Sequence, residues 1–485
     1  MLFNSLQFLV FFCIVTAAYF ALPRRTRWPL LLIASCYFYM VLVPSYILIL
    51  FFLILVDYAA GIFIEQSQGA RRKLILVLSL IANIGMLAFF KYFNFIDNNL
   101  AELFHLAGWN YPSHTLSIIL PIGLSFHTFQ SMSYTIEVYR GHHKAERHLG
   151  IYALYVLFYP QMVAGPIERP GNLLHQFHEM RYGHVSTGFD YQRVADGLKL
   201  MVWGLFKKVV IADRVSILVN EVYNHPTDHT GMPLLLATYF FAIQIYCDFS
   251  GYTDIALGAA QVMGIKLMTN FNRPYYAKSI AEFWKRWHIS LSTWFKDYLY
   301  IPLGGNRVGP WRWYFNLFFV FVISGLWHGA SWTFVVWGAL HGLYLVSSIW
   351  TASIRSKIGG FFHLDRYPIV HKYIRILLVF HMVLVGWIFF RAKTISEAWY
   401  ILTHLFDFNG VTNVFSLGLD KREMVVALLA ILVMESVHYV QRKSHVRHVL
   451  AGKPALLRWS LYIAIVLVIL VFGEFTSQDF IYFQF

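Results

Sequence analysis

The amino-acid sequence predicts an all-α membrane protein whose helices enter the lipid bilayer many times. Of its 485 residues, 58% are hydrophobic and only 13% are charged, whereas soluble domains carry about 25% charged residues. The mean hydropathy is +0.54, and the chain contains 44 Phe, 30 Tyr and 15 Trp. These values exclude a soluble enzyme of two or three domains.

Apolar stretches recur along the whole chain, and a helix needs about 20 apolar residues to cross a bilayer. They predict a polytopic array of about 11–13 membrane-embedded segments, which we expect to form a single integral-membrane domain over residues 1–485. Residues 3–22 lack a basic start and a clear cleavage site, so we expect a retained first span. Residues 233–265 are too long for one span, so we expect a bent or broken helix. The stretches begin near Phe3, Trp28, Tyr46, Leu74, Leu116, Ile151, Leu200, Pro233, Trp313, Trp332, Tyr373, Met424 and Ser460.

The charged residues predict the orientation of this array. Lys and Arg number 39 against 25 Asp and Glu, a net charge of +14, which in a soluble protein would suggest a nucleic-acid partner. Here the bases lie in short runs between apolar stretches, as the positive-inside rule expects of cytoplasmic loops, so we expect no nucleic-acid partner. The alternation of these runs places both termini on the outer face. Arg391 and Lys393 do not fit the pattern.

No pattern in the sequence predicts a disulfide, a metal or a bound cofactor. The three cysteines lie in apolar segments without the spacing of metal ligands. The chain also lacks a phosphate-binding glycine loop and a nucleotide-binding fingerprint. The cysteines are Cys13, Cys36 and Cys247.

Residues 324–342 hold the first candidate site. His328 follows Trp327 and lies between apolar stretches, and a titratable side chain at membrane depth is a functional candidate by default. A neutral imidazole, whose pKa is ordinarily about 6.5, suits proton transfer. The alternative for His328 is a core histidine hydrogen-bonded between helices, which is the role we favour for His341.

Residues 282–297 mix aromatic and basic side chains and are too polar to cross the membrane. The pattern predicts an amphipathic helix at the inner interface. A snorkelling anchor explains Trp287 and the lysines but explains His288 less well. The basic side chains could also meet the phosphates of a cytosolic donor; they are Lys285, Arg286 and Lys296.

Residues 244–254 carry Asp248 and Asp254 inside an apolar stretch. The two carboxylates could form a proton path or an acid–base pair, and a structural hydrogen-bond network that holds a broken helix is the open alternative. Residues 158–169 carry Pro160 and Pro166 at membrane depth. Two prolines there predict a kinked or re-entrant element that lines a cavity.

The chain ends in Phe-Ile-Tyr-Phe-Gln-Phe, residues 480–485. An aromatic belt at the membrane surface explains such a tail. The alternative makes the Tyr482 phenol an acyl acceptor, because a phenol ester is a reactive acyl donor and suits a relay.

Four motifs extend over the chain: PIGLSFHTFQSMSYTIEVYRG (121–141), QIYCDFSGYTD (244–254), RWHISLSTWFKDYLYIPLGGNR (286–307) and GLWHGASWTFVVWGALHG (325–342). Together they resemble the membrane-bound O-acyltransferase (MBOAT) family, and within it the bacterial branch that O-acetylates alginate. The resemblance covers essentially the whole chain, and the pair RWHxS and WHG is its most specific part.

This resemblance implies a helical array around a central tunnel that brings a cytosolic acyl thioester to a buried histidine. The WHG histidine of the family falls on His328 as the catalytic residue, and the second family position falls on His288. Asp248, Asp254 and the tryptophans beside the two histidines, Trp287 and Trp327, are expected to support the site. The donor is expected to be acetyl-CoA or an acylated carrier protein, with no bound cofactor.

In teichoic-acid systems of this branch, a small partner protein ends in the signature F-x-Y-x-x-F. Phe480, Tyr482 and Phe485 match that signature within this chain. The resemblance therefore supports Tyr482 as the residue that receives the acyl group.

The resemblance implies O-acetylation of an extracellular polysaccharide, alginate in the first place, by a protein of the bacterial inner membrane. An outward-facing acetyltransferase partner would then modify the polymer. Peptidoglycan and teichoic acid stay open as acceptors. The competing hypotheses are a proton-coupled transporter or polysaccharide-export subunit, and an acyltransferase that acts on a lipid or sterol.

Overall fold

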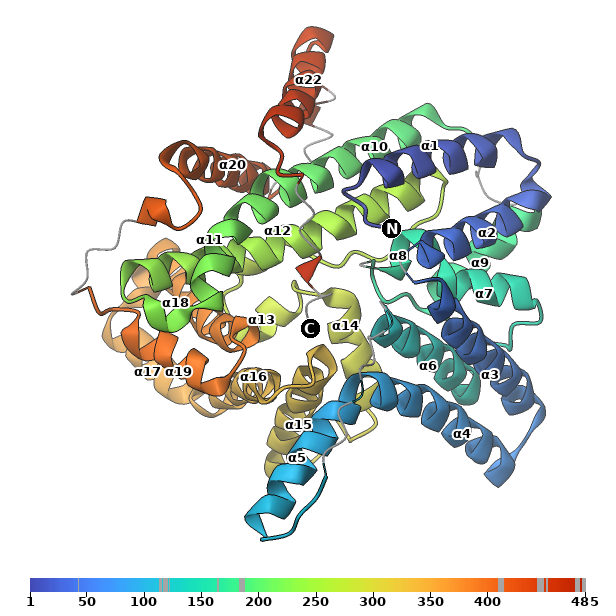
Figure 1. Cartoon of the computed structure of the whole chain (residues 1–485), viewed down its shortest axis with the longest axis horizontal. Helices are drawn as coiled ribbons and strands as arrows, with labels where there is room; N and C mark the ends of the chain where they lie inside the picture. Colours follow the sequence, from blue (N-terminus) through green and yellow to red (C-terminus); the bar gives the residue numbers. More distant parts are fainter. Residues whose placement is uncertain are drawn as a thin grey trace. The chain divides into compact units, whose positions relative to one another are not determined.

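The computed structural model is helical in every regular element that it describes (Figure 1), which confirms the all-α class. The structure describes all residues except 42, 113–115, 117–120, 122, 164, 183–187, 409–413, 443–448, 451, 476–479 and 482–485. Within the described residues, seven helical segments are long and apolar enough to cross a membrane. They are Pro44–Gln66, Gly69–Leu106, Met232–Val262, Trp332–Trp350, Pro368–Arg391, Lys421–Val440 and Ala455–Phe472.

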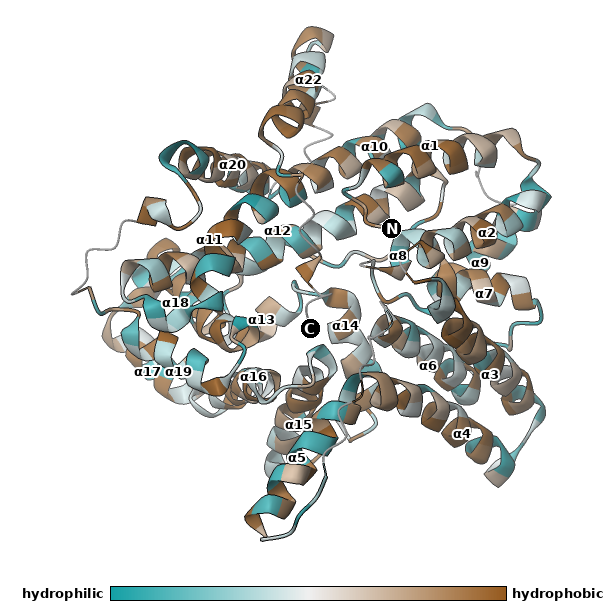
Figure 2. Ribbon diagram, in the orientation of Figure 1, coloured by the Kyte–Doolittle hydropathy of each residue, from teal (hydrophilic) through white to brown (hydrophobic). Residues whose placement is uncertain are grey.

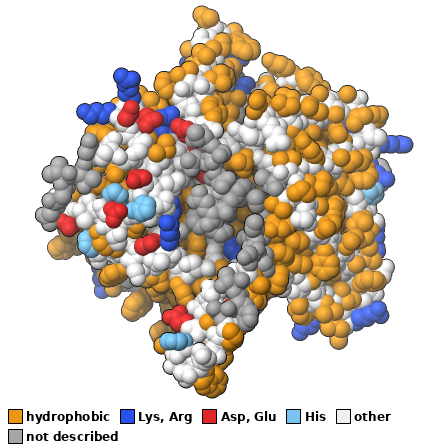
Figure 3. Space-filling view, viewed as in Figure 1, with side chains coloured by type: hydrophobic (Ala, Val, Ile, Leu, Met, Phe, Trp, Pro, Cys, Tyr) orange, Lys and Arg blue, Asp and Glu red, His pale blue; other side chains and the backbone are white. Residues whose placement is uncertain are grey.

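The outward faces of these helices carry large apolar side chains, as a surface in contact with lipid requires. Leu48 is 68% exposed and Leu470 is 66% exposed. Figure 2 shows brown, hydrophobic residues along such helices, and hydrophobic side chains dominate the face of α1–α4 in the space-filling view (Figure 3). The chain is therefore polytopic. The remaining apolar stretches of the sequence form shorter or more polar helices, such as α1 (Leu6–Ala21).

The chain packs as two compact units, and the single domain expected over residues 1–485 stays a prediction. The first unit holds residues 1–201 and 256–268. Its core includes the Asp57 carboxylate, which accepts hydrogen bonds from Ser79 Oγ at 2.6 Å and Asn83 Nδ2 at 2.9 Å. The helices of this unit are α1, α2 (Arg27–Met40), α3 (Ile47–Gln66), α4 (Gly69–Leu87), α5 (Phe93–Leu106), α6 (Leu124–Arg140), α7 (Leu149–Leu157), α8 (Tyr159–Met162), α9 (Pro170–Tyr182) and most of α10 (Tyr191–Leu205).

The helical conformation is interrupted between α7 and α8, near the first of the two prolines that predict a kink. Phe158 leaves the helical conformation with ψ at 111°, and Pro160 stands in the first turn of α8. Proline has no amide N–H and disfavours the helical conformation of the residue before it. Beyond α8, the buried Glu168 carboxylate accepts hydrogen bonds from the Met268 amide and Asn172 Nδ2, both at 2.6 Å.

The second unit holds residues 202–255 and 269–485. Its helices are the π-helical turn η4 (Phe206–Ala212), α11 (Asp213–Asn224), most of α12 (Met232–Val262), α13 (Ile280–Trp284), α14 (Ile289–Phe295), α15 (Pro310–His328), α16 (Trp332–Trp350), α17 (Ala352–Phe361), α18 (Pro368–Arg391), α19 (Ile395–His404), α20 (Lys421–Val440) and α22 (Ala455–Phe472). The segment predicted as an interfacial amphipathic helix forms α13 and α14. These short helices bury their aromatic side chains, while Lys285 and Lys296 are exposed.

Of the bent or broken helix expected over residues 233–265, the break is wrong. α12 runs without interruption for 31 residues, from Met232 to Val262. A helix need not break where its polar side chains find partners on a neighbouring element. Here Asp248 and Asp254 each pair with a lysine of η4, so the helix keeps its own backbone hydrogen bonds.

Helices α15 and α16 lie in close contact through glycines. A Cβ added to Gly325 would lie 2.2 Å from the carbonyl oxygen of Phe334, and one added to Gly338 would lie 2.3 Å from that of Phe321. Only glycine permits so close an approach of two backbones. The contact fixes the last turn of α15, which ends at His328.

Candidate active site

His288 lies in a short connection between α13 and α14 that backbone hydrogen bonds hold in place. The Ile289 amide donates to the carbonyl of Asn270 at 2.9 Å, and the Asn272 amide donates to the carbonyl of Arg286 at 2.9 Å. His288 itself has the left-handed conformation, with φ 43° and ψ 55°. Such a conformation is unfavourable for a residue with a side chain and persists where surrounding contacts enforce it.

The structure brings His328 close to His288. The two rings lie 6.4 Å apart between centroids, although 40 residues separate them in the sequence. His288 is fully buried and His328 is 4% exposed. The structure therefore places both histidines in one buried region, and the proton-transfer role expected of His328 stays a prediction.

Aromatic side chains surround both imidazoles. Trp327 and Trp337 each place a ring centroid 4.9 Å from that of His328, and the Phe249 ring lies 4.7 Å from that of His288. Burial lowers the pKa of His288 to about 3, so its imidazole is neutral near pH 7. Apolar walls of this kind keep bulk water away from a reacting group.

The tryptophans beside the two histidines take different places. Trp287 is buried against the ring of Phe283, with centroids 5.6 Å apart, and against Trp387 at 5.0 Å. Trp327 lies beside both imidazoles, since its ring is also 6.1 Å from that of His288. Trp327 is therefore in direct contact with the site, while Trp287 packs behind it.

His341 is buried one layer away from this pair. Its Nδ1 accepts a hydrogen bond from Trp284 Nε1 at 3.3 Å. A Cβ added to Gly386 would lie 2.8 Å from its Nε2, so the ring fills space that glycine leaves on α18. These contacts are typical of a packing role.

The two carboxylates of α12 each pair with a lysine of η4. Lys208 Nζ lies 2.8 Å from Asp248 and 2.7 Å from Asp213, and Lys207 Nζ lies 2.8 Å from Asp254. Asp248 and Asp254 therefore belong to separate ion-pair networks. Sequence reasoning missed the lysines, although a charge inside the apolar stretch that begins near Leu200 is the signal that should have found them.

The C-terminal segment returns to this part of the second unit. Phe480 is fully buried, and its ring lies 4.6 Å from that of Tyr252 and 5.7 Å from that of Phe249. The Ile481 amide donates to Asp248 Oδ2 at 2.8 Å. The segment is thus held beside Phe249, which itself contacts His288. Tyr482 and Phe485 lie outside the described residues.

The three basic candidates for donor binding differ in their surroundings. Arg286 Nη2 donates to Glu282 at 2.6 Å, and Arg286 also lines a hollow of about 230 Å³. Lys285 and Lys296 are exposed and are absent from the lining of that hollow. Within the described part of the chain, no group of three or more His, Cys, Asp or Glu side chains could hold a metal ion.

Comparison with known proteins identifies the family. The model of the MBOAT, membrane-bound O-acyltransferase, family matches residues 142–390, a range that includes both histidines. The chain is 38% identical to a probable alginate O-acetylase AlgI of Pseudomonas aeruginosa, over 84% of this chain and 75% of that protein. It is 35% identical to a peptidoglycan O-acetyltransferase of Helicobacter pylori, over 90% of this chain and 86% of that one.

A more distant relative is a teichoic acid D-alanyltransferase of Bacillus subtilis. It is 27% identical over 59% of this chain and 71% of its own. The names of all three relatives describe the transfer of an acyl group. The matches to the first two cover more than four-fifths of this chain. The apolar helices, the buried pair of histidines and these matches agree, and the chain belongs to the membrane-bound O-acyltransferase family.

Proposed function

We propose that this O-acyltransferase moves an acetyl group from a cytosolic thioester to an acceptor hydroxyl, for O-acetylation of an envelope polysaccharide. The observation that carries the proposal is the buried pair of His288 and His328, 6.4 Å apart between ring centroids. A transporter would use buried titratable groups to move protons, but it would not consume a thioester. The matches to acyltransferases over most of the chain favour the transfer reaction.

In the proposed reaction, His328 acts as the general base. It takes the proton from the acceptor hydroxyl as the oxygen attacks the thioester carbonyl. The new C–O bond forms, the C–S bond breaks, and the proton passes to the departing thiolate. His288 orients the thioester or stabilises the developing oxyanion. Trp327 and Trp337 keep water from the reacting carbonyl, so that hydrolysis does not compete.

The proposed first acceptor is the phenol of Tyr482. The two residues before it, Phe480 and Ile481, are buried, and Phe480 packs against Phe249. The Ile481 amide donates to Asp248 Oδ2 at 2.8 Å, so the described end of this segment is held beside the site. The alternative acceptor is a serine of an outward-facing partner protein.

The proposed final acceptor is a sugar hydroxyl of a polysaccharide on the outer side of the bacterial inner membrane. The names of the relatives support alginate in the first place and peptidoglycan in the second. A polymer is too large to enter a site walled by tryptophans, so a partner acetyltransferase would complete the transfer. With both termini on the outer face, the tail and this partner would meet there.

The test measures acyl transfer from radiolabelled acetyl-CoA to the purified full chain in detergent. The variants are His328→Ala, His288→Ala and Tyr482→Phe, and His381→Gln is the control because that histidine is exposed on α18. We expect the wild type and the control to take up label and the three variants to lose it. Label retained by Tyr482→Phe alone moves the acceptor from Tyr482 to another residue of this chain.

Label retained by His328→Ala contradicts the proposed base. If the wild type takes no label, the same assay with an acetylated carrier protein distinguishes a carrier donor from a chain that transfers no acetyl group. Addition of membranes that contain alginate or peptidoglycan then identifies the polymer that receives the label.

A further inference from the structure

Two neighbouring hollows in the second unit are lined mainly by basic side chains. The first, of about 230 Å³, is lined by Arg273, Lys278, Arg286, Lys372 and Arg442, together with apolar and tyrosine side chains. The second, of about 360 Å³, shares Lys278 and Lys372 with it and adds His371 and Arg375. Neither lining contains Asp or Glu among the described residues. Outside the lining, Glu282 pairs with Arg286 at 2.6 Å. The remaining Lys and Arg side chains give the linings an excess of positive charge, which favours an anionic ligand.

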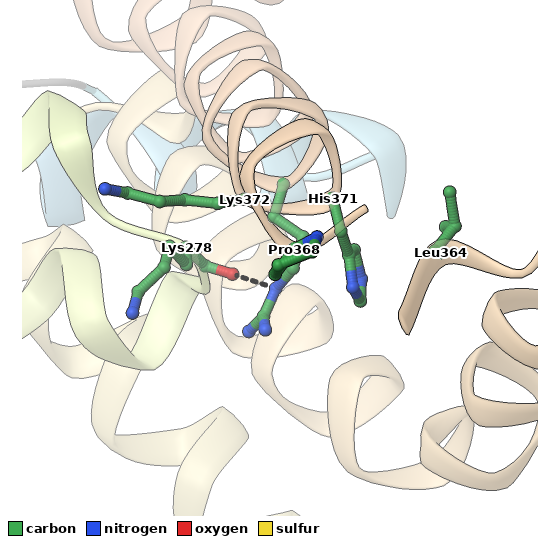
Figure 4. Close-up of a pocket in the computed structure, with 6 residues that line it drawn as sticks. Lys278, Leu364, Pro368, His371 and Lys372 are labelled. Carbon is green, nitrogen blue, oxygen red and sulfur yellow. Dashed lines mark hydrogen bonds between the residues drawn. The ribbon is translucent and has the colours of Figure 1, made fainter. Parts of the chain in front are cut away.

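The close-up of the second hollow shows how it is built (Figure 4). His371 and Lys372 belong to the first turns of α18, and Lys278 comes from the segment before α13. Arg375 Nε donates to the carbonyl of Lys278 at 3.1 Å, and this hydrogen bond joins the two elements. The Arg375 side chain is therefore fixed against the backbone of the segment that carries Lys278, while the Lys278 side chain is exposed.

Arg273 in the first hollow has an unfavourable backbone conformation and an unfavourable electrostatic surrounding. Its backbone has a φ of 48°, in the left-handed region. Its Nε and Nη2 both donate to Asn272 Oδ1, at 3.3 and 3.2 Å, while Nη1 is buried and has no hydrogen-bond partner among the described residues. Burial, with Arg286 and Arg442 nearby, lowers the pKa of Arg273. An anion in the hollow would satisfy the free N–H groups and offset this repulsion.

The position of the hollows indicates where the anion comes from. Pro368 lines the second hollow and is the first residue of α18, a span of 24 residues. The turns that follow expose large apolar side chains, with Ile369 at 70% and Leu378 at 61%. The basic side chains thus lie at the end of a lipid-facing helix, at the level where a bilayer presents its head groups.

We propose that the two hollows form one binding site for a phosphate ester, and that the head group of an acidic phospholipid fits it best. The phosphates of a coenzyme A thioester share this chemistry, so the experiment distinguishes the two sources. The site goes beyond the proposed transfer reaction, and its test measures binding without any acyl transfer. A negative result for the binding site therefore does not contradict the proposed acyl transfer, and a negative result for acyl transfer does not contradict the binding site.

The first variant is Lys278→Gln with Lys372→Gln, since these two side chains line both hollows. The matched control is Arg312→Gln with Lys421→Gln, two exposed side chains outside the linings whose loss removes the same charge. A second variant, Arg273→Gly, removes the guanidinium at a position where glycine is the favoured residue. At least one of the two variants should fold.

Binding is measured on the purified full chain by native mass spectrometry with phosphatidylglycerol and phosphatidylcholine, and by equilibrium dialysis with radiolabelled coenzyme A. We expect the wild type and the control to bind phosphatidylglycerol in preference, and both variants to bind it at least about tenfold more weakly. If the variants bind only coenzyme A more weakly, the phosphate-ester site is supported and its ligand is the thioester donor. Unchanged binding of both ligands by folded variants, or no binding by the wild type, overturns the proposal.

Discussion

Replacing Lys208 with methionine should destabilise the protein more than almost any other single change. Its ammonium lies 2.7 Å from Asp213 and 2.8 Å from Asp248, and all three side chains are at most 3% exposed. The variant would leave two buried carboxylates facing each other without a cation. Removal of one partner from a buried ion pair costs about 3–5 kcal/mol, because the remaining charge is uncompensated.

The triple variant Lys208→Met, Asp213→Asn, Asp248→Asn tests that cause directly. It removes the cation and both carboxylates, so no unpaired charge remains, and replacement of whole buried ion pairs is often close to neutral. We expect its free energy of unfolding to return to within about 2 kcal/mol of the wild type. The substituted amide at position 248 would still offer an oxygen to the Ile481 amide, which donates to Asp248 at 2.8 Å in the wild type.

The assay is equilibrium unfolding of the full chain in mixed detergent micelles. Lys357→Met on α17, where the lysine is exposed, is the control and should change the free energy of unfolding by less than about 0.5 kcal/mol. Digestion by carboxypeptidase provides a second measurement, since the single variant should release the C-terminal segment. The reasoning is refuted if Lys208→Met costs under about 1 kcal/mol, or if the triple variant is no more stable than the single one.

Three further predictions concern the packing around the site. Gly338→Ala should lower the free energy of unfolding by at least about 1–3 kcal/mol, because its Cβ would lie 2.3 Å from a carbonyl oxygen of α15; thermal unfolding checks this against Gly360→Ala, which has open space. Because burial lowers the pKa of His288 to about 3, the unfolded chain binds a proton that the folded chain does not. Stability should therefore fall as the pH drops from about 6.5 towards 3, and an equal slope in His288→Gln would contradict this. Trp284→Phe should cost about 1–3 kcal/mol by removing the donor to buried His341, and a double-mutant cycle with His341→Phe should show coupling.

The all-α membrane class could be predicted from the sequence because the tendency to enter a bilayer is a property of one local stretch. A run of apolar residues predicts a span whatever lies beside it. The same argument singles out His288 and His328, since a titratable group in an apolar surrounding is costly wherever it occurs. It applies equally to Lys207 and Lys208, which sequence reasoning passed over.

The partners of these groups were decided only by the tertiary structure. The sequence leaves both an acid–base role and a structural role open for Asp248 and Asp254. The structure pairs each of them with a lysine of η4, and those pairs also explain why α12 stays one helix. His288 and His328 become neighbours through packing: glycines let α15 and α16 touch next to His328, and Asn270 holds the connection that carries His288. A sequence determines what each residue costs to bury, but the packing of helices far apart in the chain determines which residue offsets that cost.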